Sequence, residues 1–328
     1  MSFGTFRFIL ALNVLATHVL DYSEAGPQWA AGYGSVEAFF VLSGYFITHS
    51  LRRSYLDGLG GFSRFWINRS LRLYPTHWLA LLVCLSLPSG SVVPAQISDA
   101  GVFPNIMLWG MANVFSTPNP PVNGPMWSLG IELPAYLVMS IWAARSHRHA
   151  KSFIFASLII LLIFSTIYQQ NASHRIHILF TSIATQMFPF SIGCWLVGAR
   201  RSRAIGSRIF IISTLFTIWV LPFDSLTLYL FALVTPLAIL ACEAHPGGRL
   251  DQLLGNLSYP VYVWHIPVIA VLSSWKIHGW LLLAGTPLMT ILVAMITIIL
   301  VDSPIALYRE KIRNPPNSMQ IFQESRSP

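Results

Sequence analysis

Apolar segments of about membrane-crossing length recur along the chain from residue 5 to residue 301. A helix of roughly 20 apolar residues spans the hydrocarbon core of a bilayer, so each such segment predicts a transmembrane helix. Only 10% of the residues are charged and mean hydropathy is +0.61, whereas soluble domains carry about 25% charge. We therefore predict an all-α, polytopic membrane helix bundle of about ten transmembrane helices. The predicted spans are residues 5–22, 34–51, 73–88, 126–143, 152–168, 178–198, 208–222, 226–242, 258–274 and 281–301.

The placement of Lys and Arg predicts the orientation of this bundle. With the N-terminus in the cytoplasm, nearly all loop cations fall on the cytoplasmic side, and only Arg175 and Lys276 fall outside. This asymmetry is typical of membrane proteins and explains the net charge of +8 without any nucleic-acid partner. We interpret the first span as retained rather than as a signal peptide. We expect one domain over residues 1–328, with a short cytoplasmic tail from about residue 302.

The stretch "RFILALNVLATH" places two ionisable residues, Arg7 and His18, in the first span. Eleven residues of helix turn to about 20° past three full turns, so both side chains share one face, about 16 Å apart along the axis. Such groups usually face the interior of a bundle. Glu132, in "NGPMWSLGIELPAYL", enters its span from the outer side at a similar predicted depth, so we predict a Glu132–His18 pair that orients the imidazole. The alternatives are a snorkelling arginine, a packing histidine and a structural carboxylate.

Arg69 and Arg72 lie in "FSRFWINRSLRLYPTHWL", where aromatic residues alternate with arginines. The pattern predicts an amphipathic helix at the membrane interface. Residues three apart share a helix face, so the two guanidinium groups suit a phosphate ester or a diphosphate. Anchoring to anionic lipid is the alternative.

Two further ionisable residues lie in predicted spans. Glu37, in "GSVEAFFVLSGYF", enters from the outer side, and His265, in "GNLSYPVYVWHIP", lies mid-span. A structural hydrogen bond is the alternative role for both. Ser43-Gly44 indicates close packing of two helices. The outer loop 89–125 has no Lys or Arg and is either a binding surface or a passive connector.

Five motifs in order resemble the acyltransferase 3 family of integral membrane acyltransferases: "RFILALNVLATH", "GSVEAFFVLSGYFI", "FWINRSLRLYP", "MWSLGIE" and "LGNLSYPVYVWHIP". The resemblance covers nearly the whole chain. It implies transfer of an acyl group, usually acetyl, from cytoplasmic acyl-CoA to a hydroxyl of a glycan or lipid-linked saccharide. It also implies a multi-pass protein of a bacterial inner membrane with both termini in the cytoplasm.

The resemblance assigns roles to residues. Glu37 stands where many members have Asp, and Glu132 lacks the second carboxylate that is common beside it. We expect His18 and Glu132 to be catalytic, Arg7, Arg69 and Arg72 to bind acyl-CoA, and Glu37, Trp127, Ser128 and His265 to bind substrate.

We expect no metal and no permanently bound cofactor, with acetyl-CoA or another acyl-CoA as co-substrate and a glycan and membrane lipids as partners. Direct transfer and an acyl-histidine intermediate both fit the residues. A multi-span transporter or flippase of a polar or glycolipid substrate is the main alternative, because buried Arg, His and Glu also form proton relays. A non-catalytic scaffold is another. The sequence does not identify the acceptor, the acyl group, the oligomeric state or the role of the loop 89–125.

Overall fold

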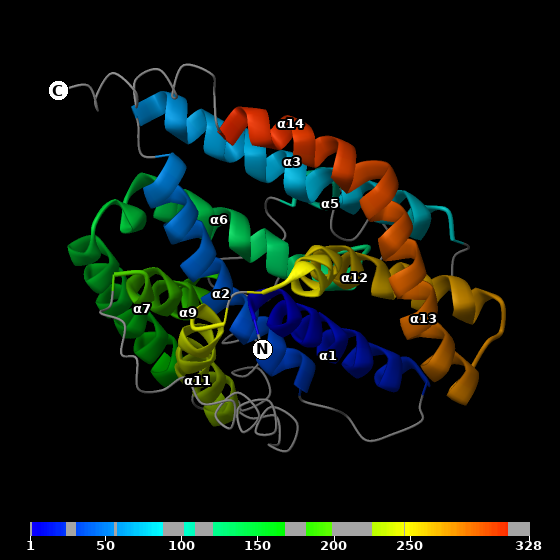
Figure 1. Ribbon diagram of the computed structural model, residues 1–328. Helices are drawn as coiled ribbons and strands as arrows, with labels where there is room; N and C mark the ends of the chain where they lie inside the picture. Colours follow the sequence, from blue (N-terminus) through cyan, green and yellow to red (C-terminus); the bar gives the residue numbers. More distant parts are fainter. Residues whose placement is uncertain are drawn as a thin grey trace.

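The computed structural model of the protein describes residues 2–23, 31–55, 58–87, 102–108, 121–167, 182–198, 225–245 and 247–313. Within these ranges the secondary structure is helical and without strands, as Figure 1 shows. The predicted all-α fold of membrane type is confirmed. The α-helices are α1 (Phe3–Ser23), α2 (Ala31–Ser54), α3 (Gly58–Leu85), α5 (Val102–Met107), α6 (Trp127–Ile141), α7 (His147–Ile167), α9 (Ile183–Leu196), α11 (Ser225–Glu243), α12 (Arg249–Ser274), α13 (Gly279–Thr297) and α14 (Ser303–Arg313).

Every predicted span that falls on described residues coincides with a helix, whereas the span 208–222 lies outside them. In the described part of the chain, four helical stretches are long and apolar enough to cross a membrane. These are Phe3–Ser23, His147–Phe164, Arg249–Ser274 and Gly279–Arg313.

Helix α12 begins at Arg249, before its predicted span 258–274, and two other helices continue into neighbouring elements. The predicted interfacial segment and the span 73–88 form one helix, α3, which passes through Pro75 without a break. Beyond α13, a π-helical turn (Ile298–Asp302) leads into α14, which occupies the first part of the predicted tail. Of the outer loop 89–125, the described part comprises α5 and the residues from 121 onward.

Helices α1 and α12 form a parallel pair that runs through the bundle (Figure 1). Asp251, in the first turn of α12, accepts hydrogen bonds from the backbone N–H groups of Gly4 at 3.0 Å and Thr5 at 2.6 Å, and from the Thr5 hydroxyl at 2.8 Å. A carboxylate at this position satisfies orphan donors at the start of α1 and opposes the positive end of its dipole. Both helices therefore begin at the same end of the bundle.

Helix α2 runs antiparallel to α1, because the Gly32 N–H at its start donates to the Thr17 hydroxyl near the end of α1 at 2.9 Å. Midway along, α2 crosses α9 at close range. A Cβ atom on Gly44 would lie 2.1 Å from the Phe190 carbonyl oxygen, and one on Gly193 would lie 2.0 Å from the Val41 carbonyl oxygen. The predicted close packing at Ser43-Gly44 is confirmed, and it carries the second half of α2 to the end of the bundle where α1 begins.

Candidate active site

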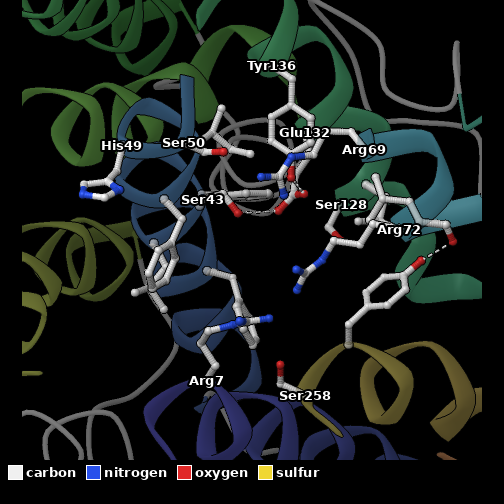
Figure 2. A pocket seen from close by; sticks show the side chains of 18 of the residues that line it. Arg7, Ser43, His49, Ser50, Arg69, Arg72, Ser128, Glu132, Tyr136 and Ser258 are labelled. Atoms are coloured by element: carbon white, nitrogen blue, oxygen red, sulfur yellow. Dashed lines mark hydrogen bonds between the residues drawn. The ribbon is translucent and has the colours of Figure 1, made fainter. Parts of the chain in front are cut away.

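One cavity of about 480 Å³ opens between α1, α2, α3, α6 and α12, near the end of α14. Figure 2 shows side chains from these helices pointing into a shared space. Helices from the start, middle and end of the sequence thus contribute to one site. Of the residues singled out from the sequence, it brings together Arg7, Arg69, Arg72, Ser128 and Glu132.

The three arginines reach the cavity from α1 and α3, and two of them pack on aromatic rings. The guanidinium carbon of Arg7 lies 6.0 Å from the centroid of the Phe46 ring, and that of Arg69 lies 5.6 Å from the Phe65 ring. Arginine at this range gains a cation–π interaction and keeps its N–H groups free for an anion. Arg7, Arg69 and Arg72 are each half-buried, so the cavity offers a cluster of positive charge partly shielded from water.

Glu132 places a carboxyl group at this cluster. Its carboxylate accepts a hydrogen bond from the Ser43 hydroxyl at 2.8 Å and a second, short one from the Tyr136 hydroxyl, and it interacts electrostatically with Arg69 and Arg72. Two hydroxyl donors and nearby cations offset part of the cost of burying this carboxyl group inside the bundle.

The predicted Glu132–His18 pair is therefore wrong. The two groups belong to different levels of the bundle, because Glu132 lies in the arginine cluster near Arg7, and His18 is about 16 Å further along α1. The prediction matched the two residues by counting from the predicted ends of their spans. In the structure, hydrogen bonds from Ser43 and Tyr136 hold the carboxylate beside the arginine cluster.

His18 instead contacts another imidazole. Its ring stacks on that of His265 in α12, with centroids 5.2 Å apart and planes at 23°. His265 is fully buried, and the Tyr262 ring meets it edge-on at 5.8 Å and 66°. The Tyr262 hydroxyl lies 2.8 Å from the Ser128 hydroxyl, and both of these residues line the cavity. His18 thus faces the interior of the bundle, and the rings of His265 and Tyr262 connect it by contact to the cavity lining.

Glu37 and Trp127 lie outside the set of residues that line the cavity. Glu37 is buried, and its carboxylate accepts a hydrogen bond from the Gln186 amide at 2.7 Å, which joins α2 to α9. The Trp127 ring packs edge-on against Phe40, a cavity residue, at 6.4 Å. The roles in substrate binding that we expected for both stay predictions.

Several residues of the cavity were not predicted from the sequence. Tyr136 lies four residues after Glu132 and Tyr262 three residues before His265, so helical spacing alone could have placed each on the same face as its partner. Arg53 and Arg313 also line the cavity. In the sequence both contribute only to the asymmetry of loop charge, because no pattern distinguishes them from the other loop cations.

The sequence matches the profile of the acyltransferase 3 family, described as an acyltransferase domain, over residues 2–303. Bacillus subtilis (strain 168) has a similar protein named "Putative peptidoglycan O-acetyltransferase YrhL". It is 28% identical over 317 residues, which cover 82% of this chain and 48% of that protein. "Exopolysaccharide production protein ExoZ" of Rhizobium meliloti (strain 1021) is 28% identical over 278 residues, which cover 76% of this chain and 81% of that protein.

A Staphylococcus aureus (strain COL) protein named "Putative O-acetyltransferase" is 27% identical over 318 residues, which cover 83% of this chain and 51% of that protein. The chain thus spans about half the length of the Bacillus and Staphylococcus relatives. No solved structure matches the chain at a significant level. Because the family profile extends over nearly all of the sequence, the protein belongs to the acyltransferase 3 family.

Proposed function

We propose that the protein transfers an acyl group, in the first instance acetyl, from cytoplasmic acyl-CoA to a hydroxyl group of an extracytoplasmic glycan or lipid-linked saccharide. The observation that carries this proposal is the cavity that gathers Arg7, Arg69 and Arg72 in a chain of an acyltransferase family. The names of two relatives, which refer to peptidoglycan and to an exopolysaccharide, support a glycan acceptor.

In this proposal the donor binds from the cytoplasmic side. Guanidinium groups form short, charge-assisted and often bidentate hydrogen bonds with phosphate oxygens, so the arginine cluster suits the diphosphate of CoA. Glu132, fixed by Ser43 and Tyr136, interacts electrostatically with Arg69 and Arg72 and would hold their side chains in place before the donor arrives. Both α1 and α12 begin at this end, which agrees with a cytoplasmic N-terminus.

His18 is the proposed general base. One imidazole nitrogen would take the proton of the acceptor hydroxyl while the hydroxyl oxygen attacks the thioester carbonyl. The carbon–sulfur bond then breaks, the CoA sulfur receives that proton, and the products are an O-acyl ester and free CoA. The thioester arm must pass the Tyr262 and His265 rings, because about 16 Å of helix separates Arg7 from His18.

An acyl-histidine intermediate would use the same residue as nucleophile. In that route the acyl group moves first to the His18 nitrogen, CoA leaves, and the acceptor hydroxyl then attacks the acyl-imidazole. Initial-rate kinetics separate the two routes, because only the second produces free CoA before the acceptor binds.

The test uses the purified protein in proteoliposomes with radiolabelled acetyl-CoA and surface glycan from a deletion strain. We expect label in the glycan and one free CoA per acetyl ester, with both products lost in His18→Ala. Arg148 is an exposed cation of α7 outside the cavity, and Arg148→Ala should behave as wild type. Movement of unmodified glycan without consumption of CoA would support the transporter alternative, and normal turnover in His18→Ala would remove His18 from the chemistry.

A further inference from the structure

The cations of the cavity lie at two depths. Arg7, Arg69 and Arg72 are half-buried, whereas Arg53 and Arg313 line the same cavity and are exposed. Arg53 lies in the last turn of α2 and Arg313 is the last residue of α14. The cavity thus has an outer rim of positive charge in front of its inner arginine cluster.

Not every arginine at this end of α2 lines the cavity. The Arg52 side chain donates from Nε to the Ala144 carbonyl oxygen at 2.8 Å, so it ties α2 to the short 3₁₀ helix Ala143–Arg145. Arg53, the next residue, contributes to the cavity instead. Of two adjacent arginines, one holds the structure together and one is left facing the space that a ligand would enter.

A buried asparagine positions both helix ends that carry the outer arginines. Asn68 of α3 donates from its amide nitrogen to the Tyr55 hydroxyl at 3.0 Å and to the Arg309 carbonyl oxygen at 3.2 Å. Its amide oxygen accepts from Arg309 Nε at 3.0 Å. Tyr55 lies two residues after Arg53, and Arg309 lies one helical turn before Arg313. The Asn68 amide therefore connects the end of α2 and the end of α14 to α3, next to Arg69.

A second contact fixes α14 along α3, as Figure 1 shows for the two helices. The Thr76 hydroxyl donates to the Asp302 carboxylate at 2.9 Å, just before α14 begins. Residues four apart share a helix face, so the contact of Arg309 with α3 also sets the direction of Arg313. Specific contacts therefore fix the two helix ends from which Arg53 and Arg313 reach the cavity.

We propose that Arg53 and Arg313 form an outer anion subsite, positioned by Asn68, that binds the ribose 3′-phosphate of the acyl-CoA donor. The inference rests on the proposed function. In acyl-CoA the thioester is at one end, the diphosphate lies between pantetheine and ribose, and the 3′-phosphate is on the ribose toward the other end. A donor that enters thioester first places its diphosphate at the inner arginine cluster and its 3′-phosphate at the rim.

The test compares CoA with 3′-dephospho-CoA, which differ only in this phosphate. Binding of each is measured by calorimetry on the full-length protein in nanodiscs, and turnover is measured separately with the two acetyl thioesters. We expect wild type to bind CoA about tenfold more tightly than 3′-dephospho-CoA, since a charge-assisted contact of this kind commonly contributes that much. The double variant Arg53→Ala, Arg313→Ala should lose the difference by weakening CoA alone.

Two further variants sharpen the result. Asn68→Ala should reduce the preference for CoA without removing either outer arginine, because it releases the ends of α2 and α14. Arg148→Ala removes an exposed cation that lies outside the cavity and should keep the full preference. The Arg53 and Arg313 substitutions lie at exposed positions, so they report on binding even where Asn68→Ala fails to fold.

The outcomes separate the subsite from the proposed function. Equal binding of the two ligands by wild type, or equal weakening of both in the double variant, would overturn the subsite. A tenfold preference for CoA together with an absence of acetyl transfer would contradict the proposed function and leave the subsite supported.

Discussion

Replacing His265 tests whether it orients His18 by stacking. The two rings lie 5.2 Å apart at 23°, and neither residue lines the cavity. An aromatic contact contributes about 0.5–1.5 kcal/mol beyond the burial of its area. Its loss would lower the equilibrium constant between the stacked His18 rotamer and its other rotamers by about 2- to 13-fold, because about 1.4 kcal/mol corresponds to a factor of ten.

We therefore expect His265→Leu to lower kcat measurably, by at most about 13-fold, since leucine fills a similar volume without a ring. His265→Phe keeps a ring that can stack, so its kcat should stay close to that of wild type. The KM for acetyl-CoA should stay close to that of wild type in both variants, because the arginines proposed to bind the donor are untouched. Ile266→Leu, at the next buried position of α12, serves as the matched control for core substitution.

The assay is initial-rate acetyl transfer in proteoliposomes at saturating acetyl-CoA, with the thermal unfolding of each variant measured in the same preparation. A fall in His265→Phe as large as that in His265→Leu would refute stacking as the contribution of His265 and point to its imidazole nitrogens. Wild-type turnover in both variants would remove His265 from the orientation of His18. A parallel rise in KM would mean that the substitution disturbs the cavity.

Three other substitutions test the packing and the arginine cluster. Gly44→Ala should destabilise the fold by about 1–3 kcal/mol in thermal unfolding, because its Cβ would lie 2.1 Å from a backbone oxygen of α9. A Cβ atom on Gly285 would lie 3.7 Å from a leucine methyl group, so Gly285→Ala should leave the stability unchanged. Equal destabilisation by the two substitutions would contradict the close crossing of α2 and α9. Asp251→Ala should lower the free energy of unfolding by about 0.5–2 kcal/mol and speed amide hydrogen exchange in the first turn of α1. Unchanged exchange there would show that the Asp251 carboxylate does not hold this turn. Tyr136→Phe removes one hydrogen-bond donor from the Glu132 carboxyl group. The carboxyl group should then compete with the donor for the nearby guanidinium groups, so the KM for acyl-CoA should rise. An unchanged KM would argue against coupling between this carboxyl group and the proposed donor site.

The sequence predicted the positions of the helices better than the side-chain contacts between them. Apolar length located the helices, and helical periodicity placed Arg69 and Arg72 together, because both signals are local to one segment. The partners of Glu132 depend on the depth at which separate helices cross. An error of four residues in a helix end shifts that depth by about 6 Å, and tilt adds to it, so counting from span ends could not distinguish His18 from Ser43.

The contact between His18 and His265 shows what fixes depth in this bundle. Apolar side chains impose little register on membrane helices, because lipid is as apolar as leucine, so small residues and polar contacts decide it. At the start of α1, the Gly4 N–H donates to Asp251, a residue 247 positions later in the sequence. The two helices are close here, because a Cβ on Gly255 would lie 3.0 Å from the Gly4 Cα. His18 and His265 have the same separation and lie fourteen residues further along both helices, about 21 Å from the cap. A slip of one turn would move the rings about 5.4 Å apart along the axis and break the stack, so the carboxylate at one end of the pair sets the geometry of the imidazoles near the other.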